Sequence, residues 1–262
     1  MLLAIDVGNT NIMLGLYEGE KLGPHWRLST DHARMPDEFA MQLLGLLGHA
    51  GVAPDEITGV AVASGVPVLT TRWCQVARRY LHVEPVVISA GMETGLTILY
   101  DNPSSVGADR IVDAVAAFHR YGGPLIIVDF GTAPTFEAIT AAGEYLGGAI
   151  APGIGISAEA LGRRAAKLPT IDIERPPSPI GRNTVHSMQS GLFYGYVGLV
   201  EGMVTRFRGE IGQEAVVIGT GGLAPLIASG TEIIDIIAPW LTLDGVRLLY
   251  EMNNADGAGA AT

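Results

Sequence analysis

An apolar run that ends in Asp-x-Gly occurs twice in this chain, once in each half. The first copy spans residues 2–10 (LLAIDVGNT) and the second spans residues 125–133 (LIIVDFGTA). In both copies the apolar residues predict a buried strand that carries an aspartate to its end. The glycine two positions later permits a tight turn and lets the backbone approach a ligand closely. Two such turns predict two related lobes that close on one phosphate-bearing ligand.

The pattern of apolar and turn residues predicts the same order of elements in both halves. For the first half we expect strands at 2–7, 11–17, 24–30, 57–64 and 86–88, and helices at 36–50, 66–80 and 106–120. For the second half we expect strands at 125–130, 134–140, 145–150, 215–219 and 233–237, and helices at 156–166, 184–208, 223–229 and 242–252.

The order strand-strand-strand-helix-strand-helix recurs, which indicates an α/β lobe duplicated within the chain. We therefore expect an N-terminal lobe at 1–120 and a C-terminal lobe at 121–252. The last residues, 253–262 (NNADGAGAAT), are small and polar and are typical of a flexible tail.

Charge and composition limit the partners of the chain. The formal net charge of -11 argues against a nucleic-acid surface, because such surfaces are basic. The same charge means that a bound polyphosphate needs a divalent metal ion and a few arginines. No segment predicts a membrane span, and the apolar N-terminal run is too short for the core of a signal peptide. With one cysteine, Cys74, and hence no internal disulfide, we expect a cytoplasmic protein with no membrane partner.

The two Asp-x-Gly turns carry the chemical groups that phosphoryl transfer from a nucleotide requires. Asp6 and Asp129 offer carboxylates to Mg²⁺ or its bound water. Neutral donors for the phosphates follow in both turns: Asn9, Thr10, Asn11 and Thr132.

Two further segments have more than one interpretation. Gly219-Thr220-Gly221-Gly222 follows a predicted strand and opens a helix, so it either binds a nucleotide or is only a tight turn. In Gly107-Ala108-Asp109-Arg110, the aspartate and arginine either form a local ion pair or act on a substrate. In the second case Asp109 accepts a proton from an alcohol while Arg110 holds an anionic group. The sequence contains no G-x-x-x-x-G-K-[ST] motif, which excludes a P-loop kinase.

Taken together, these motifs resemble those of the type III pantothenate kinase family. The matching segments are DVGNTN at 6–11, YDNP at 100–103, GADR at 107–110, DFGTA at 129–133, GGAIAPG at 147–153 and GRNT at 181–184. They occur in the family's order and extend over residues 2–250. The resemblance implies the two-lobe, actin-like and ribonuclease H-like α/β fold of the acetate and sugar kinase/Hsp70/actin superfamily. It also implies phosphorylation of pantothenate by ATP, the first step of coenzyme A biosynthesis.

The resemblance also implies a role for each matching residue. ATP would contact Asp6, Val7, Gly8, Asn9, Thr10, Asn11, Ile12, Met13 and Thr132. Pantothenate would contact Tyr100, Gly107, Ala108, Asp109, Arg110 and Thr184. Asp109 would be the general base, Asp6 would lie near Mg²⁺, and Asp129 would bind a monovalent cation, K⁺ or NH₄⁺. Thr184 matches a position that the family's homodimer contributes from the neighbouring subunit.

Two features bear on these implications. The apolar, glycine-containing helix near 190–208 indicates either a dimer interface or burial within one lobe. The family commonly has Thr-Ala-Thr-Thr in the second phosphate turn, whereas this chain has Thr132-Ala133-Pro134-Thr135. Pro134 removes a hydroxyl and a backbone N–H, so we expect weaker or rearranged phosphate contacts with the site retained.

Two alternative functions remain at this point. The first is a non-catalytic transcriptional regulator on the same fold, which Pro134 favours. Asp6, Asp109, Arg110 and Asp129 together argue against it, because a binding module needs no base. The second is a sugar kinase of the same superfamily, which would not require Tyr100 and Gly-Ala-Asp-Arg at this spacing.

Overall fold

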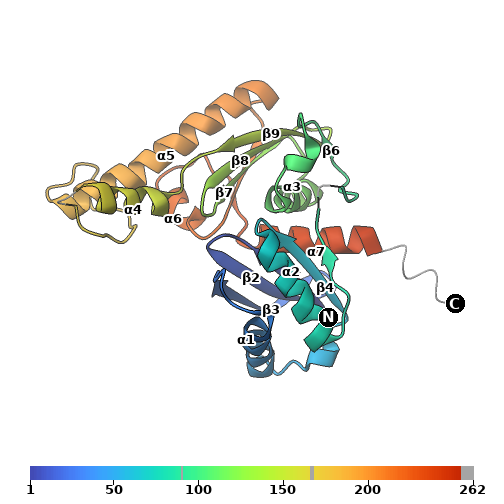
Figure 1. Cartoon of the computed structure of the whole chain (residues 1–262). Coiled ribbons are helices and arrows are strands. Elements are labelled where there is room, and N and C mark those ends of the chain that lie inside the picture. The colour runs from blue at the N-terminus through green and yellow to red at the C-terminus, as the bar shows by residue number, and fades with distance from the viewer. Residues whose placement is uncertain (90, 166–167, 255–262) are drawn as a thin grey trace. The chain divides into compact units, whose positions relative to one another are not determined.

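The chain forms two compact units in a computed structural model that describes residues 1–89, 91–165 and 168–254 (Figure 1). Unit 1 contains the described residues of Met1–Leu96, Asp101–Ala116 and Leu241–Asn254. Unit 2 contains Thr97–Tyr100 and Ala117–Trp240.

Unit 1 is built on a five-stranded mixed sheet in the order β3-β2-β1-β4-β5. The central strand β1 is antiparallel to β2 and parallel to β4. The strands are β1 (Leu2–Val7), β2 (Asn11–Glu18), β3 (Lys21–Ser29), β4 (Gly59–Ser64) and β5 (Val86–Val87). The helices are α1 (Pro36–His49), α2 (Pro67–Val76), the first part of α3 (Ala108–Tyr121) and α7 (Leu241–Asn254), with short turns η1 (Pro54–Glu56), η2 (Ala77–Leu81) and η3 (Pro103–Ser105).

Alternate residues of β1 define the core of unit 1. Leu3, Ile5 and Val7 are fully or almost fully buried in one cluster with α1 and α2. In α1 the contacting residues include Phe39, Leu43 and Leu47, whose i, i+4, i+8 spacing gives one apolar face. Successive strand residues point to opposite faces, so Asp6 lies on the sheet face opposite these two helices.

Helix α7 packs on the strands of unit 1 through a partly buried polar network. The Tyr17 hydroxyl on β2 donates a hydrogen bond of 2.7 Å to Oδ1 of Asp244. Burial and that hydrogen bond raise the pKa of Tyr17, so its phenol keeps the proton that it donates. Arg247 extends over the Tyr17 ring and donates to Oε2 of Glu251 at 2.5 Å. Because a buried polar group is costly without its partner, this network fixes α7 against β2.

Unit 2 repeats the sheet of unit 1 and adds one edge strand. Its order is β11-β10-β7-β8-β9-β6, with β7 antiparallel to β8 and parallel to β10. The strands are β6 (Thr97–Ile98), β7 (Leu125–Phe130), β8 (Pro134–Ile139), β9 (Glu144–Ile150), β10 (Val216–Thr220) and β11 (Ile236–Ile237). The helices are α4 (Ile154–Arg164), α5 (Thr184–Ile211), α6 (Ala224–Ala228) and the end of α3. Replacing β1–β5 by β7–β11 gives the same order, which confirms the predicted duplication.

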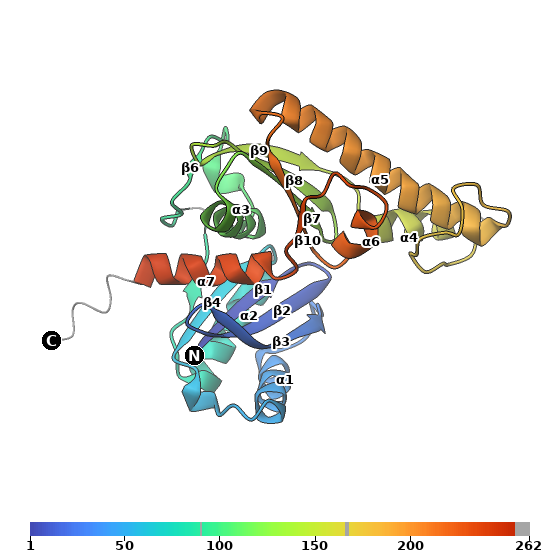
Figure 2. The same ribbon diagram turned by 180° about the vertical axis from the view of Figure 1, so that it is seen from behind.

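The core of unit 2 lies between its sheet and the long helix α5, which follows one face of the strands (Figures 1 and 2). Ile126, Val128 and Phe130 of β7 form a buried cluster with α5 side chains that include Phe193 and Val197. The same alternation therefore places Asp129 on the face opposite α5. The two aspartates occupy equivalent positions in the two sheets.

The two units differ from the lobe boundaries expected from the sequence. The expected lobe at 121–252 includes α7, whereas the structure groups α7 with the strands of unit 1. The short strand β6 connects residues 97–100 to unit 2, because Thr97 and Ile98 pair with Glu144 and Tyr145. Of the expected tail at 253–262, the first two residues end α7 and the rest lies outside the described residues. No helix in the described ranges has the length and apolar character that a membrane crossing requires.

A close crossing of α7 and α3 in unit 1 gives the first prediction. A Cβ at Gly245 would lie 2.0 Å from the carbonyl oxygen of Val112, so the two helices approach only because residue 245 is glycine. We expect Gly245→Ala to lower the free energy of unfolding by about 1–3 kcal/mol or more, the usual cost of overpacking a core. Urea denaturation followed by circular dichroism measures it.

The matched control is Gly45→Ala in the exposed middle of α1, where an added Cβ meets nothing within 4 Å. Alanine costs less backbone entropy than glycine in a helix, so this change should stabilise unit 1 by about 0.5–1 kcal/mol. Equal changes in the free energy of unfolding for the two substitutions would contradict a close approach of α3 and α7 at Gly245.

Candidate active site

The first Asp-x-Gly segment forms a β-hairpin whose turn presents polar groups. Asp6 pairs with Met13 and Val7 with Ile12 across β1 and β2. The turn is closed by a hydrogen bond of 3.0 Å from the Gly8 N–H to the Asn11 carbonyl. Asn9, Thr10 and Asn11 are exposed at the tip. The side chains of Val7 and Ile12 are fully buried, so these two residues offer only backbone groups to a ligand.

Thr30, which the sequence analysis did not single out, holds this turn from both sides. Its hydroxyl donates to the Gly8 carbonyl at 2.7 Å, and its N–H donates to the Thr10 carbonyl at 2.9 Å. Thr30 directly follows β3, where Ser29 pairs with Asn11. The one sequence signal was a hydroxyl residue at the end of the third predicted strand. Its partner could be found only from the register of β2 and β3.

Gly107, Asp109 and Arg110 form a compact start to α3. Asp109 is exposed, and its Oδ1 accepts a hydrogen bond of 2.9 Å from the Arg110 N–H. A Cβ at Gly107 would lie 2.3 Å from the same oxygen, so glycine is required for the carboxylate to fold back over residue 107. Arg110 is only 8% exposed. The segment therefore combines an exposed carboxylate with a guanidinium largely withdrawn from water.

In unit 2, the glycine-rich segment 219–222 lies beside Asp129. Strand β10 is the parallel neighbour of β7 and pairs Thr220 with Asp129. Gly221 has φ +85°, and a Cβ there would lie 2.5 Å from Oδ1 of Asp129. The glycine-rich segment and the second Asp-x-Gly turn are thus in direct contact, and only a glycine at position 221 leaves room for the Asp129 carboxylate.

A further turn, just before α4, packs against the turn that contains Thr132. A Cβ at Gly153 would lie 1.8 Å from the carbonyl oxygen of Thr132, so the two backbones are in direct contact. Thr132 is exposed in the turn between β7 and β8. Pro134 begins β8 opposite Phe130, and its carbonyl accepts a hydrogen bond of 2.9 Å from the Ala151 N–H. Pro134 is therefore part of the regular sheet, and its carbonyl oxygen is hydrogen-bonded.

Tyr100 and Thr184, the other predicted site residues, also lie in unit 2. Tyr100 is half-buried, with its ring against Gly147 and 6.5 Å from the ring of Tyr145. Thr184 is exposed and is the first residue of α5. Asn183 caps that helix, because its Oδ1 accepts a 2.8 Å hydrogen bond from the His186 N–H.

The distribution of carboxylates bears on how a metal ion could bind. In the described part of the chain, no three or more His, Cys, Asp or Glu side chains gather in a way that could hold a metal ion. Mg²⁺ bound to a nucleotide commonly takes one or two carboxylates and completes its shell with phosphate oxygens and water. Single carboxylates such as Asp6 and Asp129 fit that kind of site.

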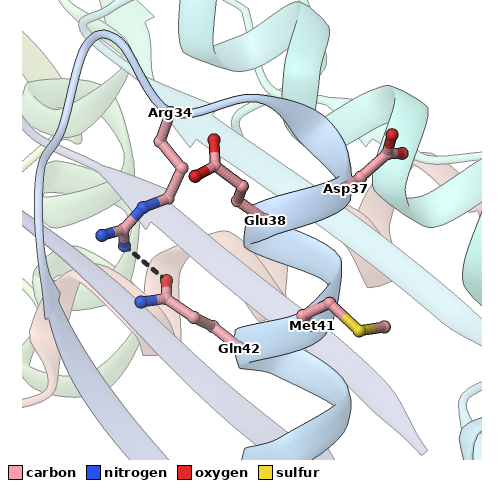
Figure 3. A pocket seen from close by; sticks show the side chains of 5 residues that line it. All are labelled: Arg34, Asp37, Glu38, Met41 and Gln42. Carbon is pink, nitrogen blue, oxygen red and sulfur yellow. Dashed lines mark hydrogen bonds between the residues drawn. The ribbon is translucent and has the colours of Figure 1, made fainter.

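Two hollows in the surface contain none of the predicted site residues. The first, of about 410 Å³, is lined by Arg34, Asp37, Glu38, Met41 and Gln42. Figure 3 shows Arg34 directed at Gln42, to which it donates a hydrogen bond of 2.6 Å, while Asp37 is directed away. The second, of about 450 Å³, lies between α4 and residues 170–173. The candidate site is therefore defined by its turns and their chemistry.

The comparisons with known proteins agree on one family. The sequence model of that family, described as type III pantothenate kinase, matches residues 2–206. A type III pantothenate kinase from Roseiflexus sp. (strain RS-1) is 53% identical over 255 residues, covering 97% of this chain and 100% of the relative. Another from Geobacillus kaustophilus (strain HTA426) is 52% identical over 253 residues, covering 97% and 98%.

Solved structures support the fold. A protein described as a Baf family transcriptional activator from Campylobacter jejuni has a TM-score of 0.61 at 16% identity, covering 97% of this chain and 99% of its own. A protein described as a 2-dehydro-3-deoxygalactonokinase from Sinorhizobium meliloti has a TM-score of 0.58 at 11% identity, covering 96% of each. These likenesses show that the chain shares the fold of these two proteins, and its two α/β units fit the two-lobe fold expected from the sequence. The family model and the near-complete relatives show that this chain belongs to the type III pantothenate kinase family.

Proposed function

We propose that this protein transfers the γ-phosphoryl group of ATP to the primary hydroxyl of pantothenate. The observation that carries the proposal is the identity of more than half to type III pantothenate kinases along nearly the whole chain. The geometry adds an exposed carboxylate at Asp109, and hairpin turns with polar tips that follow Asp6 and Asp129. Such groups supply the base and the phosphate contacts that an alcohol-directed kinase needs.

ATP is bound, in this proposal, by residues 6–13 and by Thr132. The exposed tip Asn9-Thr10-Asn11 offers amide, hydroxyl and backbone N–H donors to phosphate oxygens. Asp6 lies near Mg²⁺, which would neutralise phosphate charge and orient the phosphates. The burial of Val7 and Ile12 supports backbone contacts there and fixes the hairpin that carries the tip.

Asp109 is proposed as the general base. It accepts the proton of the substrate hydroxyl while the oxygen attacks the γ-phosphorus in line with the leaving ADP oxygen. The backbone hydrogen bond to Oδ1 holds the carboxylate in one rotamer, which limits the entropy lost on reaching the reactive geometry. Oδ2 is the oxygen that would receive the proton.

The pantothenate pocket is proposed to contain Tyr100, Gly107, Ala108, Asp109, Arg110 and Thr184. Arg110 would hold the carboxylate of the substrate by paired hydrogen bonds, the geometry for which guanidinium is suited. Its burial supports this role, because a charge pair is stronger where water is excluded. Ala108 supplies only backbone and a small methyl group, which leaves room for the substrate.

A homodimer is proposed, with Thr184 reaching the pocket of the neighbouring subunit. Support comes from apolar side chains exposed around the start of α5 and on α4. Ile180 is 79% exposed and Val185 is 40% exposed, and Ile156 on α4 is 49% exposed. A second copy covering these side chains would remove apolar surface from water.

Neither alternative function has support of the same kind. The likeness to a protein described as a transcriptional activator is at 16% identity, and the likeness to a sugar-acid kinase is at 11%. Pro134, which favoured the regulator, keeps its place and its carbonyl hydrogen bond within β8. We therefore propose no function besides the kinase.

A coupled assay of ADP release with ATP, Mg²⁺, K⁺ and pantothenate tests the function and its base together. We expect turnover by the protein as it stands, and a loss of about 100-fold or more in kcat for Asp109→Asn, the usual range for removing a general base. ATP binding by Asp109→Asn, measured by isothermal titration calorimetry, should be retained. Turnover without pantothenate, or normal turnover of Asp109→Asn, would contradict the proposal.

Thr30 gives a second kinetic test, because its hydroxyl holds the ATP-binding turn. Thr30→Val removes the hydrogen bond to the Gly8 carbonyl and leaves a side chain of similar size. We expect KM for ATP to rise about three- to tenfold, since one such bond contributes roughly 0.5–1.5 kcal/mol. Thr30→Ser, which keeps the donor, should restore KM, with KM for pantothenate unchanged in both. Equal KM values for the valine and serine variants would show that the hydroxyl is not involved.

The monovalent cation is proposed to bind at Asp129, whose carboxylate lies beside the backbone of Gly221. Carboxylate and carbonyl oxygens are the donors that hard cations prefer. At constant ionic strength, replacing choline by K⁺ should raise the rate for the unaltered protein but not for Asp129→Asn. Asp172→Asn, at an exposed site elsewhere in unit 2, is the matched control. If K⁺ still raised the rate of Asp129→Asn, the proposal that the cation binds at Asp129 would be contradicted.

A further inference from the structure

Tyr100 lies next to a glycine because of the register between β6 and β9. These strands are parallel and pair Ile98 with Tyr145, and the Leu99 N–H donates to the Tyr145 carbonyl at 2.9 Å. Extending that register by two residues places Tyr100 opposite Gly147. The edge strand thus carries Tyr100 to one particular position on β9.

Gly147 leaves the space that the Tyr100 ring fills. A Cβ at Gly147 would lie 2.9 Å from Cε2 and 3.0 Å from Cδ2 of that ring. These are atoms of a rigid ring, so the collision could be relieved only by moving the whole side chain. Gly147 also has φ +108°, a conformation that side chains other than glycine rarely adopt. Any other residue would therefore displace Tyr100.

Tyr145 supports the same ring from inside unit 2. Its ring centroid is 6.5 Å from that of Tyr100, at an interplanar angle of 54°, within the range of favourable tilted aromatic pairs. Tyr145 is fully buried and its hydroxyl donates to the Glu137 carboxylate on β8. Glu137 is only 1% exposed. A buried carboxylate is costly without donors, so this bond fixes the orientation of Tyr145.

We propose that Gly147 and Tyr145 are positioning residues that hold Tyr100 in the orientation in which it contacts pantothenate, with Glu137 fixing Tyr145. This inference rests on the proposed function, which assigns Tyr100 to the pantothenate pocket. It gives a physical reason for two of the segments that carry the family resemblance, Tyr100 and the glycine pair that begins at 147. None of the three supporting residues acts on the reacting atoms, so their effect should fall on substrate affinity.

The kinetic test is Gly147→Ala in the full-length protein. We expect KM for pantothenate to rise about tenfold, the equivalent of one lost contact of ordinary strength. KM for ATP and kcat should each change less than about twofold, because binding of the other substrate and the chemical step are untouched. An unchanged KM for pantothenate would overturn the inference.

Gly230→Ala is the matched control for a collision with an aromatic ring. A Cβ at Gly230 would lie 2.7 Å from Cζ of Phe193. The substitution thus introduces a similar aromatic collision in unit 2, just after α6 and outside β6 and β9. It should lower thermal stability and leave KM for pantothenate unchanged. A rise in KM equal to that of Gly147→Ala would show a general loss of structure and overturn the inference.

A double-mutant cycle with Tyr100→Ala separates positioning from a structural effect. Once the ring is removed, adding Gly147→Ala should raise KM for pantothenate no further, because nothing remains to be displaced. Additive effects would mean that Gly147 acts independently of Tyr100, which contradicts the inference.

A readout without turnover keeps the inference distinct from the proposed function. In protein labelled with 3-fluorotyrosine, the ¹⁹F resonance of Tyr100 is assigned by its loss in Tyr100→Phe. The Tyr100 resonance should shift in Gly147→Ala and in Tyr145→Phe. It should keep its chemical shift in Glu137→Gln, because the glutamine oxygen can still accept the Tyr145 hydrogen bond. An unshifted resonance in both Gly147→Ala and Tyr145→Phe would refute the inference that these two residues position Tyr100. Absence of ADP release with pantothenate refutes the function instead.

Discussion

The alternation of side chains along two central strands is the constraint on which both halves of the structure depend. In β1 and in β7, every second residue is buried against helices. An aspartate one position out of that phase must therefore lie on the other face of its sheet. A shift of one residue in either strand would place the carboxylate among the apolar side chains that pack against the helices. Folding the core correctly and presenting Asp6 and Asp129 are thus the same event.

Glycine determines how closely the surrounding turns approach those strands. The missing side chains of Gly221 and Gly153 admit the Asp129 carboxylate and the Thr132 backbone, and Gly107 admits the Asp109 carboxylate. Each contact would be lost with alanine, since an added Cβ would fall within 2.5 Å of an oxygen. Backbone packed this tightly has few alternative conformations, so its N–H groups stay directed where they are before any ligand arrives.

Local sequence patterns predicted most elements, whereas partnerships across the chain had to come from the structure. The two Asp-x-Gly strands, the helix at 36–49 and the long helix from Thr184 follow from periodicity and turn residues alone. The grouping of α7 with unit 1 does not, because it depends on Tyr17 meeting Asp244 across most of the chain length. The contacts of Thr30 with the Gly8 turn and of Gly147 with Tyr100 could not be predicted, for the same reason. Each of these contacts is made with a residue that is distant in sequence, so it cannot be recognised from the adjacent residues of the chain.

The charge of the chain gives a physical reason for the composition of the proposed phosphate contacts. With a net charge of -11, a nucleotide triphosphate is repelled at long range by the protein that binds it. In the proposed site, neutral donors on the two hairpin tips would offset this repulsion, because they can bind phosphate oxygens without a nearby cationic side chain. These donors are Asn9, Thr10, Asn11 and Thr132. In this proposal, the remaining negative charge is balanced by cations that bind together with the nucleotide. Single carboxylates, rather than a preformed cluster of ligands, suit ions that complete their coordination with phosphate oxygens. The proposed dependence on added cations would therefore follow from the negative charge of the chain that carries the phosphate site.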